Sequence, residues 1–201
     1  MLVDAELFVV ADEMLVEVLS RIREADLSLE LPPLFERPDY DSRCTLRFAV
    51  QVHLRSEDAA QRALTGQEAV PCPAVDRTLP ASALQAMVVA AAAVAAQAAK
   101  QAQDSRAILT TPQGLVSTED YLRQLTLTRC LVAHYVAALL GSAACPLPEE
   151  LARPLWELTS PAAERWRARG YFRAPLPLPE QVSWRDRFLL HAGHEQHPHV
   201  H

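Results

Sequence analysis

The sequence predicts an all-α protein, built as a bundle of four long helices with a C-terminal extension of short helices. Four segments place apolar side chains at helical spacing, and 50% of the 201 residues are hydrophobic, which is enough for a packed core. The 5 glycines are too few for a β-sandwich or a glycine-rich nucleotide-binding loop, and the 15 prolines cluster outside the periodic segments. These observations together favour long helices over sheets.

The first two helices are expected over residues 6–25 and 46–64. In the first, Met14 and Val18 share an apolar stripe that runs between acidic and basic side chains. In the second, the inward-facing positions recur at i, i+3, i+4 and i+7 from Leu46. This spacing places one face of each helix in the core.

The third and fourth helices are expected over residues 81–106 and 117–140. The third is rich in alanine, which has the highest helix propensity and allows close approach of neighbouring helices. The fourth is expected to begin at Ser117 as its N-cap and to stop at Gly141. Between the two helices, residues 107–116 are expected to form a short β-like excursion around a turn rather than a sheet.

The composition shifts after Gly141, and shorter elements are expected there. The expected short helices cover residues 148–158, 162–169 and 184–192. We assign residues 1–145 to the bundle, 146–193 to an extension packed on it, and 194–201 to a disordered tail rich in histidine.

Charge and cysteine usage exclude several classes of partner. A net charge of -6 without a basic patch disfavours nucleic acid as a partner. Acidic residues stand where a signal peptide needs basic ones, and the apolar run of residues 87–96 is too short to span a membrane. Without an export signal, we expect reduced thiols and a cytoplasmic location. The four cysteines are Cys44, Cys72, Cys130 and Cys145.

Three residues on inward helix faces form a candidate metal site. His53 lies on the buried stripe of the second helix, while Cys130 and His134 are one turn apart on the fourth. A pair at i, i+4 and one histidine from a facing helix supply three ligands of a tetrahedral metal and leave a fourth position open. Glu57, four residues after His53, is a candidate general base or further ligand. The same spacing also occurs where such residues only pack in a core.

Several stretches carry a family resemblance. Residues 42–53 read Ser-Arg-Cys-Thr-Leu-Arg-Phe-Ala-Val-Gln-Val-His, and residues 130–139 read Cys-Leu-Val-Ala-His-Tyr-Val-Ala-Ala-Leu. Together with residues 110–121, 169–180 and 186–193, they resemble the DinB-like, metal-binding helical bundles of actinobacteria that are related to mycothiol-dependent maleylpyruvate isomerase. The excess of arginine over lysine, together with many alanines, fits a GC-rich bacterial genome.

The resemblance implies a divalent metal, with zinc the expected ion, held by His53, Cys130 and His134. Cys130 stands where the family has glutamate, and Ala137 stands where it has aspartate. The resemblance further implies that a low-molecular-weight thiol, mycothiol, binds at the open position. The resulting thiolate would attack an electrophilic small-molecule substrate, as in an isomerase or a thiol transferase.

Two other functions remain open from the sequence. A metal-dependent hydrolase or cyclase would use metal-bound water with Glu57 as its general base and would need no thiol. A non-catalytic bundle would instead bind a partner, and a homodimer is one such arrangement. Its candidate anchors, which equally fit packing against the bundle, are Trp156, Trp166 and Trp184.

Overall fold

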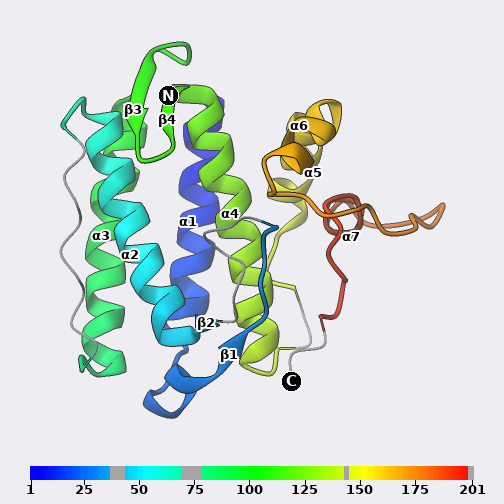
Figure 1. Cartoon of the computed structure of the whole chain (residues 1–201), viewed down its shortest axis with the longest axis horizontal. Coiled ribbons are helices and arrows are strands. Elements are labelled where there is room, and N and C mark those ends of the chain that lie inside the picture. The colour runs from blue at the N-terminus through cyan, green and yellow to red at the C-terminus, as the bar shows by residue number, and fades with distance from the viewer. Residues whose placement is uncertain (37–43, 69–77, 143–144, 199–201) are drawn as a thin grey trace.

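The computed structural model describes residues 1–36, 44–68, 78–142 and 145–198 (Figure 1). The described chain is mostly helical and carries only two short two-stranded sheets, which confirms the predicted all-α class. Of the four cysteines, Cys72 lies outside the described residues. Cys44, Cys130 and Cys145 are free thiols.

Four long helices make up the larger part of the molecule. They are α1 (Val3–Leu19), α2 (Leu46–Leu64), α3 (Ala81–Gln101) and α4 (Thr118–Leu139). The predicted cap of α4 is confirmed, because the Ser117 hydroxyl accepts a hydrogen bond from the Asp120 backbone N–H. The first helix ends earlier than expected, and a 3-10 helix, η1 (Glu24–Ser28), follows it. The third also ends earlier, at Gln101 rather than at residue 106.

The long helices lie side by side in Figure 1, and their contacts define the arrangement. α1 packs closely against both α4 and α3, and α3 packs against α2. α2 and α4 instead face each other across a pocket that both of them line. The candidate functional site lies where α1, α2 and α4 converge.

Two short antiparallel sheets join the helices. β1 (Glu30–Leu31) pairs with β2 (Cys44–Thr45), next to the start of α2. β3 (Ile108–Thr111) pairs with β4 (Gly114–Ser117), so the expectation that residues 107–116 form no sheet is wrong. The Thr111 hydroxyl closes this hairpin by donating to the Gly114 carbonyl and accepting from the Gln113 N–H.

The C-terminal segment packs its aromatic side chains into the protein. Its elements are α5 (Glu149–Thr159), η3 (Ser160–Ala162), α6 (Ala163–Ala168) and α7 (Trp184–His191). Trp166 is fully buried against Tyr171 and Phe172, while Trp156 contacts Trp184 across the α5–α7 interface. These contacts support the packing role for the three tryptophans.

The tail is ordered beyond the point expected from sequence. His194 is 0% exposed, and its Nδ1 lies 3.1 Å from the Tyr135 hydroxyl of α4. The next residue, Glu195, places its carbonyl oxygen 2.9 Å from His134 Nε2. The start of the tail therefore packs on α4 through contacts to His134 and Tyr135. Residues 199–201 lie outside the described part of the chain.

α3 combines the length and the hydropathy that a membrane-spanning helix needs. By length and a mean hydropathy of 1.6, it is the one described helix that could cross a membrane, a test that core helices also pass. Of its most apolar window, 33% is buried, and its buried face packs against α1 and α2.

The turn that leads from α7 into the tail requires a glycine. Gly193 has φ +81°, and a Cβ there would lie 2.5 Å from the Ala174 carbonyl oxygen. Gly66 has a similar φ, +69°, but a Cβ there would meet nothing within 4 Å. Alanine substitutions at the two positions therefore distinguish the free-energy cost of the backbone conformation from that of a steric clash.

We expect Gly66→Ala to lower the free energy of unfolding by about 1–2 kcal/mol, the cost of the left-handed conformation. Gly193→Ala adds overlap with the backbone of residue 174 and should cost clearly more. Urea unfolding of both variants measures the difference. Equal destabilisation would contradict the close approach of residues 173–174 to the end of α7.

Candidate functional site

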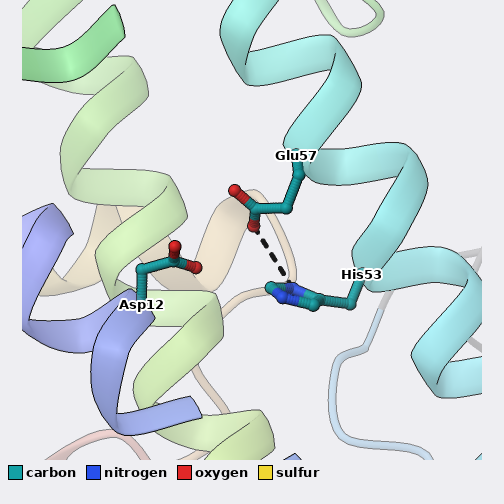
Figure 2. Close-up of side chains that lie close together, drawn as sticks. All are labelled: Asp12, His53 and Glu57. Carbon is teal, nitrogen blue, oxygen red and sulfur yellow. Dashed lines mark ion pairs between the residues drawn. The ribbon is translucent and has the colours of Figure 1, made fainter. Parts of the chain in front are cut away.

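A layer of four buried polar side chains crosses the interior between α1, α2 and α4. Asp12 comes from α1, His53 and Glu57 come from consecutive turns of α2, and Arg129 comes from α4. Their exposed fractions are 2%, 6%, 0% and 2%, respectively. Figure 2 shows the first three converging from two helices. The layer lies at the boundary between two apolar clusters of the core.

Arg129 holds the layer together. Its Nε donates to Asp12 Oδ1 at 2.8 Å, its Nη2 donates to Glu57 Oε1, and its Nη1 donates to the Leu125 carbonyl at 3.2 Å. The Phe8 ring packs against the guanidinium at 4.5 Å. Each of the three guanidinium nitrogens therefore has a partner inside the protein, and one cation joins carboxylates from two different helices.

His53 and Glu57 form a pair on one face of α2. His53 Nδ1 lies 3.3 Å from Glu57 Oε1, the dashed contact in Figure 2. Because a carboxylate only accepts hydrogen bonds, this contact favours the tautomer with its proton on Nδ1. His53 Nε2 is then a bare acceptor. Both His53 Nε2 and Glu57 Oε2 are buried without a hydrogen-bond partner among the described residues.

Burial changes the protonation of this pair. It raises the pKa of Glu57 to about 7, although Arg129 lowers that pKa and Asp12 raises it. It lowers the pKa of His53 to about 3, and the positive charge of Arg129 lowers it further. Near neutral pH, His53 is therefore uncharged while Glu57 can either hold or release a proton.

A pocket of about 90 Å³ adjoins the layer between α2 and α4. Its wall is mainly apolar, and Phe48, which is 44% exposed, lines it where it reaches the surface. His53 and Arg129 belong to its lining, so the pocket connects the buried layer with the outside. The apolar lining comes from α1, the β1 region, β2, α2 and α4: Leu15, Leu31, Pro32, Pro33, Leu34, Phe35, Cys44, Phe48, Ala49, Val52 and Val132.

Few polar groups in this wall are free to bind a ligand. Arg129 is engaged by the two carboxylates, and the Thr128 hydroxyl donates to carbonyls of its own helix. Among the described lining residues, His53 Nε2 is the one buried side-chain polar atom without a partner. The pocket therefore combines an apolar wall with a hydrogen-bond acceptor.

The structure does not bring His53, Cys130 and His134 together. Among the described residues, one group of three potential ligand atoms lies within 4.8 Å of one another, and it comprises Asp12, His53 and Glu57. Cys130 lies in the apolar core, where burial raises the pKa of its thiol and opposes the thiolate that a metal needs. His134 Nε2 faces the Glu195 carbonyl, which requires a proton on that nitrogen.

The Asp12, His53 and Glu57 group also fits a metal poorly in this chain. A divalent ion there would stand beside the guanidinium of Arg129, which already pairs with both carboxylates. Two cations in a buried space repel each other strongly because little water screens them. The imidazole and the two carboxylates are suitable donor groups, but Arg129 already supplies the positive charge of this centre.

The sequence pattern missed Asp12 and Arg129. Both occupy positions that helical spacing assigns to the core: Asp12 follows buried Phe8 by four residues, and Arg129 follows buried Leu125 by four. A charged residue at such a position needs a buried partner of opposite charge. That signal identifies each residue as a candidate, but it does not say which residues pair.

Buried histidines predict how stability depends on pH. Burial lowers the pKa of His194 to about 3, as it does for His53, and Arg173 and His134 lower it further. An unfolded histidine takes up a proton near pH 6.5. Between pH 6.5 and 3 the unfolded chain therefore binds more protons than the folded chain, and the free energy of unfolding falls as the pH falls.

We expect His194→Asn, which cannot take up a proton, to reduce this loss by at most about 1.4 kcal/mol per pH unit. Urea unfolding of both proteins at pH 7.5, 6.0 and 5.0 measures the difference in slope. Glu57, whose raised pKa has the opposite effect between pH 4.5 and 7, is present in both proteins and cancels in the comparison. Parallel pH profiles would contradict a buried neutral His194.

Comparison with known proteins does not identify the function of this site. We found no match to this chain among models of known protein families, among curated proteins or among solved structures. The function must therefore be inferred from the geometry of the layer and its pocket.

Proposed function

We propose that this chain binds a small, neutral, apolar molecule carrying a hydroxyl group in the pocket, and that His53 removes the hydroxyl proton. One observation carries the proposal: His53, with its Nε2 unpartnered, belongs to the wall of an apolar pocket while its Nδ1 contacts Glu57. A phenol is the simplest molecule with these properties, because it combines an apolar ring with one hydrogen-bond donor.

The charges of the layer favour a neutral ligand over an anion. Arg129 is the cation of the site, and Asp12 and Glu57 both pair with it. With Glu57 ionised, the layer carries a net negative charge, and with Glu57 protonated it carries none. In neither state does it attract a carboxylate. A ligand without a charge also avoids the cost of burying an ion.

Proton removal would proceed through both members of the pair. As the hydroxyl proton moves to His53 Nε2, the Nδ1 proton moves to Glu57 Oε1, so the imidazole stays neutral throughout. Glu57 stores the proton, and its pKa of about 7 suits that role near neutral pH. His53 contacts the ligand, whereas Glu57 orients the ring and acts through it. The product is a bound phenolate, whose negative charge replaces that of Glu57, so the total charge of ligand and layer does not change.

We further propose that the four long helices form a DinB-like four-helix bundle. Support for a DinB-like four-helix bundle comes from the side-by-side packing of α1 with α3 and α4, and of α3 with α2. The metal-bound mycothiol chemistry that the resemblance implies remains a prediction. No step of the proposed reaction passes through a metal, because Arg129 already pairs with both carboxylates of the layer, Asp12 and Glu57.

Ligand preference tests the binding step. We expect phenol to bind about tenfold more tightly than toluene, since one hydrogen bond contributes about 1–1.5 kcal/mol. Benzoate should bind more weakly than either because it is an anion. NMR titration of the amide resonances measures all three affinities and locates the site.

Two variants serve as controls for that titration. His53→Leu removes the acceptor and should make phenol and toluene bind equally. Ala49→Phe fills the pocket and should abolish binding of both. Equal binding of phenol and toluene to the unaltered protein, or chemical shifts confined to residues outside the pocket, would overturn the proposal.

The proton-transfer step has its own spectroscopic test. 4-Nitrophenol changes colour on ionisation, so its absorption reports directly whether the bound molecule is phenol or phenolate. We expect a larger phenolate fraction in the bound state of the unaltered protein than in Glu57→Gln, which cannot store the proton. A purely structural role for Glu57 would change the affinity but leave the bound fraction unaltered, and that result would remove the proton-transfer step.

A further inference from the structure

We propose that Arg129 takes the place of a metal ion in this protein: its guanidinium is the cation that Asp12 and Glu57 require, and a chain without it would bind a divalent metal through Asp12, His53 and Glu57. The unaltered protein would accordingly bind no metal at this centre. The inference holds whether or not the pocket accepts a phenol.

The position of the guanidinium supports the replacement. It donates to Asp12 Oδ1 at 2.8 Å and to Glu57 Oε1, one carboxylate from α1 and one from α2. A metal ion that bridged the same two helices would use the same two carboxylates. Arg129 is itself 2% exposed, so little solvent screens its charge from the carboxylates.

The donor atoms of a metal site are nevertheless present. One ligand atom each of Asp12, His53 and Glu57 lie within 4.8 Å of one another. His53 Nε2 and Glu57 Oε2 have no partner among the described residues, although their side chains are only 6% and 0% exposed. An imidazole and two carboxylates form a donor set that accepts zinc or cobalt.

Removal of Arg129 would change which cation the layer needs. Two carboxylates would then be buried without a positive charge, a condition that strongly destabilises a fold. Binding a divalent ion relieves that condition, and so does protonation of the carboxylates. The ion is favoured above the pH at which the carboxylates are protonated, because metal binding requires them to be ionised.

The test compares metal uptake by four proteins: the unaltered chain, Arg129→Ala, Arg129→Lys, and Arg129→Ala combined with His53→Ala. Each is equilibrated with cobalt at pH 7.5 and dialysed, after which bound cobalt is measured by elemental analysis and visible absorption. We expect about one cobalt ion per chain at the centre in Arg129→Ala only. Lysine keeps the positive charge and should exclude the ion, and the double variant lacks a ligand.

Cobalt bound by histidines of the tail is distinguished from cobalt at the centre in the same measurement, because uptake by the tail does not depend on His53. Arg129→Ala could also fold only with metal present, in which case zinc should raise its melting temperature while leaving the unaltered chain unchanged. Arg129→Met, which fills the space without a charge, provides a second variant for the same measurement.

Two results would overturn the inference. The first is cobalt bound by the unaltered chain and lost on His53→Ala, which would show that Arg129 does not exclude a metal. The second is a folded Arg129→Ala or Arg129→Met protein that binds no cobalt dependent on His53. The first measurement needs only the unaltered fold and His53→Ala, so the inference is testable even if removal of Arg129 prevents folding.

Discussion

The pairing of Arg129 with Asp12 and Glu57 is the interaction on which the interior depends. It joins α1, α2 and α4 at one level and separates two apolar clusters of the core. The three charged groups stabilise the fold less than their Coulomb energy suggests, because all three have to leave water when the protein folds. Its contribution is to specificity: any register of the three helices that separates these residues leaves a buried charge without a partner.

The same layer gives the pocket its chemical character. α1 packs against α3 and α4, and α2 packs against α3, whereas α2 and α4 face each other across the pocket, whose lining includes His53 and Arg129 of the layer. Arg129 is neutralised by its partners and therefore does not make the pocket an anion site. His53, positioned by Glu57, is left as the acceptor. A mainly apolar pocket in which His53 Nε2 is the one buried, unpartnered side-chain polar atom among the described lining residues selects ligands by a hydrogen-bond donor rather than by charge.

Periodicity and capping chemistry predicted the long helices well. α2 begins and ends where its apolar spacing places it, and Ser117 caps α4 as expected. Besides the early ends of α1 and α3, two predictions failed because the decisive contact comes from another segment of the chain. The β3–β4 hairpin depends on pairing between two short segments, and His194 is ordered because Tyr135 and the C-terminal segment enclose it. Neither contact can be predicted from the helical or alternating spacing of apolar residues in the sequence.

The sequence alone determined which helices form and that His53, Glu57, Cys130 and His134 face inward, because burial follows the helical period. Only the tertiary structure decided which of them meet. Adjacent residues on a helix point about 100° apart, so Arg129 faces α1 and α2 while Cys130 lies in the apolar core and His134 contacts the tail. The orientation of α4 about its own axis, which its packing sets, therefore directs the Arg129 guanidinium toward His53 and Glu57 of α2, where the sequence pattern suggested a metal.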